Sequence, residues 1–165
     1  MESMKMLQVT TKEEINTLSA LAHDIWNQHF VPIIGQAQVD YMLNKFLSPD
    51  ALDEQIKNGY EYFLVYFNEN LAGFTGVHDE DGSLFLSKLY VHIDYRGRGI
   101  ASRVFKELIQ ICETRNLDKI WLTCNRHNSN TLAVYDHLGF KVVREEAADI
   151  GNGFIMDDYI LEYKI

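Results

Sequence analysis

The chain has little cysteine, no excess of positive charge and no long apolar run, and each shortage excludes a class of protein. Only 2 of its 165 residues are cysteine, and Cys112 and Cys124 lack metal-site spacing, so no metal is expected. Lys and Arg number 15 against 24 Asp and Glu, which argues against a nucleic-acid partner because such proteins need a basic surface. No apolar stretch could span a membrane, and residues 1–15 lack the apolar core of a signal peptide. The sequence therefore predicts a cytoplasmic protein with no membrane partner.

Apolar side chains are plentiful. Hydrophobic residues make up 47% of the chain and aromatic residues 12%, as in a protein with a folded core. No internal repeat or linker interrupts the sequence, so we expect a single domain over residues 1–165. Both cysteines occupy apolar positions and are expected to be buried.

Two hydrophobic periods alternate along the chain and predict a mixed α/β domain. Strands are expected at residues 7–9, 60–67, 71–78, 83–93, 117–124, 140–146 and 157–163, and helices at 11–28, 37–47, 48–59, 99–116 and 128–138. The strands at 83–93 and 117–124 flank a helix, so they should be parallel with a right-handed crossover. The expected fold is α/β (α+β), with a mixed central sheet of six to seven strands and helices on both faces.

A basic, glycine-rich turn follows the central strand. Its sequence is Arg96-Gly97-Arg98-Gly99-Ile100-Ala101, and it leads directly into a helix. The first N–H groups of a helix have no intrahelical partner and lie at the positive end of the helix dipole. With glycines that admit close approach, this turn predicts an anion site, most plausibly for phosphate.

Two common phosphate loops do not fit this turn. The P-loop requires a terminal Gly-Lys-Ser/Thr, which is absent. The dinucleotide-binding pattern requires Gly or Ala where the chain has Ser102, and an acidic residue where the next strand ends in Asn125.

Two motifs resemble those of the GCN5-related N-acetyltransferases (the GNAT family). Arg96-x-x-Gly99-x-Ala101 is similar to the loop that binds the acyl-CoA pyrophosphate in that family. The segment from Asn128 to Tyr135, followed by Leu-Gly-Phe at 138–140, resembles a second family motif, with threonine at 131 where alanine is usual. The resemblance covers residues 60–140 and implies an acetyl-CoA-dependent N-acetyltransferase whose fourth and fifth strands are parallel and splayed.

The resemblance also implies which residues hold acetyl-CoA. The turn would bind the pyrophosphate, the end of the fourth strand would pair with the pantetheine arm, and Asn128 and Asn130 would contact that arm or cap the helix. Tyr135 would be the catalytic acid that protonates the departing sulfur. The expected cofactor-binding residues are Leu89, Tyr90, Val91, Arg96, Gly97, Arg98, Gly99, Ile100, Ala101, Ser102, Asn128, Asn130 and Tyr135.

The acceptor and the general base stay open at this point. Ser87 occupies the position where many relatives have a glutamate base, and other relatives use a water chain. Nearby candidates for the base in this chain are His78, His92 and backbone carbonyls. The resemblance implies that Trp26, His29, Phe30 and Tyr41, with residues 152–159, line the acceptor pocket. Within that last segment, Asp157 and Asp158 either pair with a cationic acceptor or are solvated. The tail resembles a small bacterial branch that includes polyamine acetyltransferases.

Direct attack by a primary amine in a ternary complex is the expected reaction, with a polyamine or another small amine as acceptor. The alternatives are an acyl-CoA-binding regulatory module with little turnover and an enzyme that acetylates protein N-termini or lysines. Members of the family often dimerise, so a homodimer is also an expectation.

Overall fold

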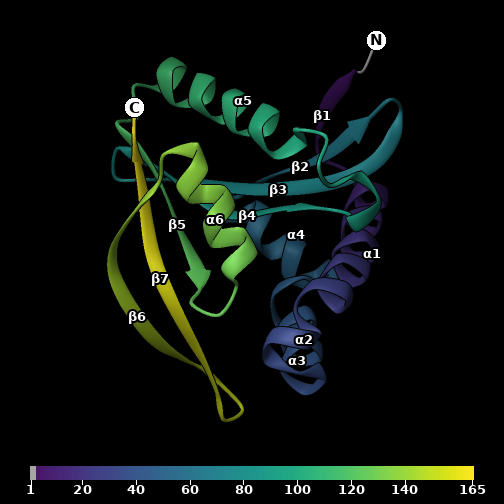
Figure 1. Ribbon diagram of the computed structural model, residues 1–165. Helices are drawn as coiled ribbons and strands as arrows, with labels where there is room; N and C mark the ends of the chain where they lie inside the picture. Colours follow the sequence, from purple (N-terminus) through teal and green to yellow (C-terminus); the bar gives the residue numbers. More distant parts are fainter. Residues whose placement is uncertain (1–2) are drawn as a thin grey trace.

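A seven-stranded mixed sheet organises the computed structural model, which describes residues 3–165 (Figure 1). The sheet order is β1-β2-β3-β4-β5-β7-β6. The strands are β1 (Met4–Gln8), β2 (Glu61–Phe67), β3 (Asn70–Glu80), β4 (Ser83–Val91), β5 (Lys119–Asn125), β6 (Lys141–Gly151) and β7 (Phe154–Lys164). The helices are α1 (Lys12–His29), α2 (Val31–Ile34), α3 (Gln36–Phe46), α4 (Pro49–Lys57), α5 (Ile100–Arg115) and α6 (Ser129–Leu138). The predicted mixed α/β fold is confirmed.

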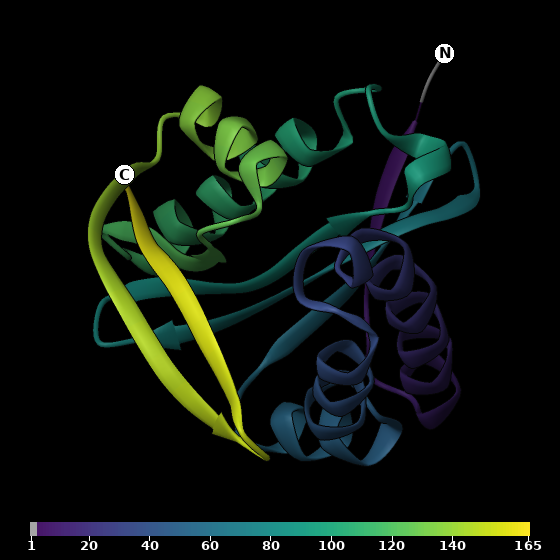
Figure 2. The ribbon, with the colours of Figure 1, turned by 60° about the horizontal axis from the view of Figure 1, so that its bottom comes forward.

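Helices cover both faces of the sheet, as predicted (Figure 2). On one face, the apolar sides of α1, α3 and α4 pack on β2 and β3, with Leu18, Val39 and Leu52 fully buried. On the other face, α5 contributes Val104 and Leu108 to a second cluster against β4 and β5. Cys112 belongs to this second cluster, and both cysteines are buried, as expected from the sequence. The sheet therefore lies between two separate layers of apolar packing.

The parallel strands β4 and β5 separate soon after they meet. They pair only at Leu84 with Ile120 and at Phe85 with Trp121, and the remainder of β4 has no partner on that side. All other neighbouring strands in the sheet are antiparallel. The gap lies toward the carboxyl ends of the two strands, which is where ligands bind in open α/β sheets. The predicted splay is confirmed.

A β-bulge at Ser87 resets the alternation of β4. Lys88 pairs with Gly76 and Leu86 pairs with Val77, so Ser87 is an extra residue in the strand. Leu86 and Leu89 consequently pack in the same cluster although they are three positions apart. Ser87 and Lys88 both line one cavity, together with their neighbours in β4 from Phe85 to Tyr90.

Several elements differ from the prediction, beginning with the first strand, which spans Met4–Gln8 rather than residues 7–9. Strand β4 ends at Val91 rather than at residue 93, because Ile93–Tyr95 form a 3₁₀ turn in which the Asp94 N–H donates to His92 Nδ1. A short helix, α2, begins just before Pro32, because proline is tolerated in the first turn of a helix. Strands β6 and β7 are longer than predicted, because Asn152 and Gly153 both have positive φ and form a tight hairpin turn.

Two helices begin where the capping residues in the sequence predict. Thr11 accepts a hydrogen bond from the N–H of Glu14, whose carboxylate accepts one from the N–H of Thr11. Ser48 likewise accepts a hydrogen bond from the N–H of Ala51 at the start of α4. No helix in residues 3–165 is long and apolar enough to cross a membrane.

Candidate active site

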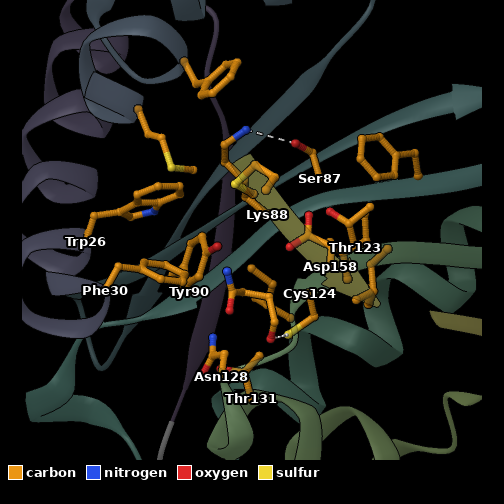
Figure 3. Close-up of a pocket in the computed structure, with 18 of the residues that line it drawn as sticks. Trp26, Phe30, Ser87, Lys88, Tyr90, Thr123, Cys124, Asn128, Thr131 and Asp158 are labelled. Carbon is orange, nitrogen blue, oxygen red and sulfur yellow. Dashed lines mark hydrogen bonds between the residues drawn. The ribbon is translucent and has the colours of Figure 1, made fainter. Parts of the chain in front are cut away.

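Two adjoining cavities open where β4 and β5 separate. The larger has a volume of about 480 Å³ and extends under α1–α4 toward the β6–β7 hairpin (Figure 3). The smaller, of about 310 Å³, lies against the glycine-rich turn and the start of α5. Leu89, Tyr90, Thr131 and Tyr135 line both cavities. We call them the acceptor cavity and the loop cavity, and this shared wall is where they meet.

The glycine-rich turn presents free backbone donors to the loop cavity. Gly97 and Gly99 have φ values of 78° and 74°, which favour glycine, and a Cβ on either would meet no atom within 4 Å. In the described chain, the backbone N–H groups of residues 97–102 form no hydrogen bond, and the first bond of α5 runs from the Arg103 N–H to the Gly99 carbonyl. This open row of donors at a helix N-terminus suits a diphosphate.

The two arginines of the turn point differently. Arg96 lines the loop cavity, and its Nε donates to the Val91 carbonyl at 3.1 Å. The Arg98 guanidinium lies 5.9 Å from the Phe67 ring and 5.7 Å from the Tyr95 ring, and Arg98 is outside the cavity wall. The structure therefore brings the side chain of Arg96 to the predicted phosphate site and directs that of Arg98 onto aromatic rings.

Tyr135 lies at the junction of the cavities. It is 7% exposed, and burial raises the pKa of its phenol above the ordinary value of 10.0. The ring packs edge-on against Phe140, with centroids 5.2 Å apart. The hydroxyl therefore keeps its proton at neutral pH, and Tyr135 lines both cavities where they meet.

The two asparagines of the second motif lie in different cavities. Asn130 lines the loop cavity, and Asn128 lines the acceptor cavity. Asn128 stands at the start of α6 without a side-chain capping bond. Its Oδ1 instead lies 3.2 Å from His29 Nε2, so the structure does not bear out capping by Asn128.

The four residues predicted for the acceptor pocket divide into three groups. Trp26 and Phe30 line the acceptor cavity, and both pack against the ring of Tyr90. His29 lines the loop cavity, and burial, followed by the charge of Arg96, lowers the pKa of its imidazole. Tyr41 lies outside both cavities, because its hydroxyl donates to the Ile150 carbonyl and ties α3 to the β6–β7 hairpin.

Three ionisable side chains line the acceptor cavity: Lys88, Glu146 and Asp158. Of these, the sequence indicated only Asp158, as one of two acidic residues that either pair with a cationic acceptor or are solvated. Burial lowers the pKa of Lys88 to about 8. Burial, followed by the charges of Asp157 and Glu146, raises the pKa of Asp158 to about 6. The signal for Asp158 was its acidic pair with Asp157, whereas nothing in the sequence marked Lys88 as a cavity residue.

The histidines considered as bases lie elsewhere. The His78 ring packs on Tyr60, with centroids 4.6 Å apart, and His92 accepts from the N–H of Asp94. Neither lines a cavity of the candidate site. Within residues 3–165, no group of three or more His, Cys, Asp or Glu side chains is arranged to hold a metal ion.

Known sequences resemble this chain across the site. The family model described as "Acetyltransferase (GNAT) domain" matches residues 30–160. The spermine/spermidine N(1)-acetyltransferase of Bacillus subtilis (strain 168) is 28% identical over 86 residues, which cover 47% of this chain and 57% of that protein. The chain spans about half the length of the curated relatives it matches.

Solved structures share the fold along nearly the whole chain. The PaiA N-acetyltransferase from Thermoplasma acidophilum, solved in complex with coenzyme A, has a TM-score of 0.82 at 21% identity and is matched over 99% of both chains. The ribosomal-protein-S18-alanine N-acetyltransferase from Escherichia coli has a TM-score of 0.70 at 18% identity, over 100% of this chain and 94% of that one. At such identities the likeness establishes the fold alone.

Proposed function

Because the chain belongs to the GNAT acetyltransferase family, we propose that it transfers the acetyl group of acetyl-CoA to a primary amine by direct attack in a ternary complex. The observation that carries this proposal is the junction of the two cavities at Tyr90 and Tyr135. One cavity has the donors for a diphosphate, and the other has room for a small acceptor. A donor and an acceptor bound on either side of the junction would meet at the Tyr135 hydroxyl.

The loop cavity fits a CoA diphosphate. Its turn carries free N–H groups and leaves open space beside both positive-φ glycines. The side chain of Arg96 adds a positive charge, and the unpaired edge of β4 from Leu89 to Val91 can receive an extended chain. The fold of a protein solved with coenzyme A is the same, which supports this assignment.

Tyr135 would act as the general acid. Bound acetyl-CoA supplies an activated thioester, and the C–S bond breaks as the amine nitrogen forms the new C–N bond. The phenol donates its proton to the leaving sulfur, and it regains one from solvent as the nitrogen loses its own, so the reaction yields an amide and a free thiol. A backbone N–H at the end of β4 would stabilise the negative charge on the carbonyl oxygen.

The acceptor is proposed to be a small amine. The relatives named for spermine and spermidine make a polyamine one candidate. A peptide amine is the second candidate, because a protein named for acetylating a ribosomal-protein alanine shares the fold. A small acceptor is favoured because the Tyr41 hydroxyl and Lys45 both donate to the Ile150 carbonyl and hold the β6–β7 hairpin against α3.

Turnover with a panel of primary amines tests this proposal. Saturating acetyl-CoA should release free thiol only when a suitable amine is present, and mass spectrometry should detect the acetylated amine. Binding of acetyl-CoA without thiol release for any amine would instead support the acyl-CoA-binding regulatory module. Absence of binding would overturn both. A homodimer stays a prediction from the family resemblance, and a cytoplasmic location stays a prediction from the apolar pattern of the sequence.

A further inference from the structure

The acceptor cavity contains a lysine whose charge no carboxylate neutralises. Lys88 Nζ donates to Ser87 Oγ at 3.0 Å (Figure 3). It also donates to Tyr62 Oη at 3.3 Å and lies 5.8 Å from the Tyr62 ring centroid. Both partners are neutral hydroxyls, and among residues 3–165 no acidic side chain forms an ion pair with Lys88. An ammonium group has three N–H donors, so one is left for a ligand.

A second donor in the same cavity also lacks a partner. Trp26 is 4% exposed, and its indole Nε1–H is buried with no acceptor among the described residues. Trp26 and Lys88 both line the acceptor cavity, on α1 and β4. A buried donor without an acceptor is costly, so these two groups together indicate a site for an anionic group of a ligand.

The β6–β7 hairpin contributes the opposite charge. Asp158 is 7% exposed, and its Oδ1 is buried with no donor in the described residues. Glu146 lies directly across the strand pair from Asp158, and both line the acceptor cavity. Their sequence neighbours Glu145 and Asp157 point to the other face, where Arg126 neutralises both at 3.3 and 2.9 Å. Among the described residues, the two cavity-facing carboxylates of the hairpin, Glu146 and Asp158, thus form no ion pair.

The two charges have different neighbours on the cavity wall. Asp158 lies opposite Asn125 in the β5–β7 register, next to Cys124, and so stands near the splay where the cavities join. Lys88 instead contacts Tyr62, whose hydroxyl bonds to Gln55 on α4, and Gln55 lines only the acceptor cavity. The amine of an acceptor must reach the junction, which assigns the cationic end of the ligand to Asp158.

We propose that the acceptor is a zwitterion whose primary ammonium group binds Asp158 and whose carboxylate binds Lys88 and Trp26. This inference rests on the proposed acetyltransferase function and names the substrate class of the same site. A polyamine would match Asp158 and Glu146 but would bring a second cation toward Lys88. An aminocarboxylate would offer its carboxylate to the Trp26 donor and the third Lys88 donor, and its ammonium group to the carboxylate of Asp158.

Matched acceptors test the proposal directly. At saturating acetyl-CoA, kcat/KM would be measured for glycine, β-alanine, γ-aminobutyrate and δ-aminovalerate, each beside the alkylamine and the diamine of the same carbon number. At least one aminocarboxylate should exceed its matched alkylamine and diamine by about tenfold or more, the effect of one added ion pair in a buried site. A diamine or alkylamine preferred at every length would overturn the proposal.

Substitution of Lys88 provides a second test of the proposal. In Lys88→Met, the ratio of kcat/KM for the aminocarboxylate to kcat/KM for the matched alkylamine should fall toward one. Lys88→Arg keeps the charge and should retain the preference for the aminocarboxylate. The ratio is measured on one folded population, so partial misfolding does not change it. An unchanged ratio in Lys88→Met would contradict the assignment of the carboxylate to this lysine.

Binding measured without turnover separates this inference from the proposed function. Calorimetric titration of the CoA-saturated protein with the same aminocarboxylates should show binding that Lys88→Met weakens by about tenfold. Such binding without thiol release would keep the zwitterion site and reject the acetyltransferase proposal. Thiol release with diamines alone would keep the acetyltransferase and reject the zwitterion site.

Discussion

His29 Nε2 lies 3.2 Å from Asn128 Oδ1, a contact between the last turn of α1 and the start of α6. Arg96 approaches the other ring nitrogen, Nδ1, at 3.5 Å. Because a guanidinium can only donate, Nδ1 accepts, and the protonated Nε2 donates a hydrogen bond to Asn128 Oδ1. One neutral imidazole thus connects the helical layer, the glycine-rich turn and α6 around the loop cavity.

Removal of this imidazole should destabilise the protein. His29→Ala leaves Asn128, which is 3% exposed, without its partner, and should lower the free energy of unfolding by about 1–3 kcal/mol. His23→Ala is the matched control, because His23 is exposed on the same helix and its effect should stay within about 0.5 kcal/mol. Urea unfolding measures both, and equal effects would mean that the contact contributes nothing.

A side chain at position 99 should block acetyl-CoA binding. Gly99→Val places a branched side chain in the space beside the free N–H groups, where the ligand is expected to bind. The free energy of unfolding of the unsubstituted protein should rise by about 2.7 kcal/mol when acetyl-CoA is present at 100-fold its Kd. Gly82→Val is the matched control, because Gly82 has φ of 83° and equally open surroundings but lies in the β3–β4 turn. Thermal shift with and without acetyl-CoA should show stabilisation in the control variant alone. Stabilisation of Gly99→Val would place the ligand elsewhere.

Loss of the Tyr135 hydroxyl should slow turnover and spare binding. Tyr135→Phe keeps the ring that packs on Phe140 and removes the proton donor, so kcat should fall by about 10²–10⁴-fold with little change in the Kd of acetyl-CoA. Tyr163→Phe is the control, because Tyr163 packs on the same Phe140 ring and lines neither cavity. Loss of binding and turnover together in Tyr135→Phe would make Tyr135 a packing residue.

The pH dependence of stability should show that burial of the ionised Asp158 carboxylate is unfavourable. The pKa of Asp158 is raised from 3.8 to about 6 in the folded protein. Its contribution to the free energy of unfolding is therefore most favourable below pH 3.8, and this stability is lost as pH rises through 6. The groups that face it are Tyr90, Cys124 and Glu146, and none is a cation. As pH rises from 4 to 7, the free energy of unfolding of Asp158→Asn should therefore increase by about 1–2 kcal/mol relative to that of the unsubstituted protein.

Denaturant unfolding at several pH values checks this prediction. Asp157→Asn is the control, and it should give no such gain because Asp157 is already paired with Arg126 at 2.9 Å. A difference between Asp158→Asn and the unsubstituted protein that is constant across this pH range would show that Asp158 is not titrating there.

The sequence identified the elements whose signals are local. The Thr11 capping box, the Ser48 cap and the Gly97 and Gly99 turn each depend on a few consecutive residues, and each forms as predicted. The splay of β4 from β5 came from the family resemblance and is confirmed by a ladder of only two residue pairs. The parallel direction of these strands followed from the helix between them.

The remaining features depend on contacts between distant segments. The bulge at Ser87 lies opposite Gly76 and Val77 of β3, and a Cβ at Gly76 would come within 2.5 Å of the Tyr62 ring. Periodicity within β4 cannot reveal such a partner, so Lys88 was not recognised as a cavity residue. Likewise, the bond from Tyr41 to the Ile150 carbonyl joins segments 109 residues apart.

A crystal structure of the protein with CoA tests the central claim most directly. The account predicts the diphosphate against the backbone N–H groups of residues 97–102, the pantetheine arm along β4 from Leu89 to Val91, and the thiol beside Tyr135. A diphosphate bound anywhere else, or a thiol directed away from the junction of the two cavities, would contradict it.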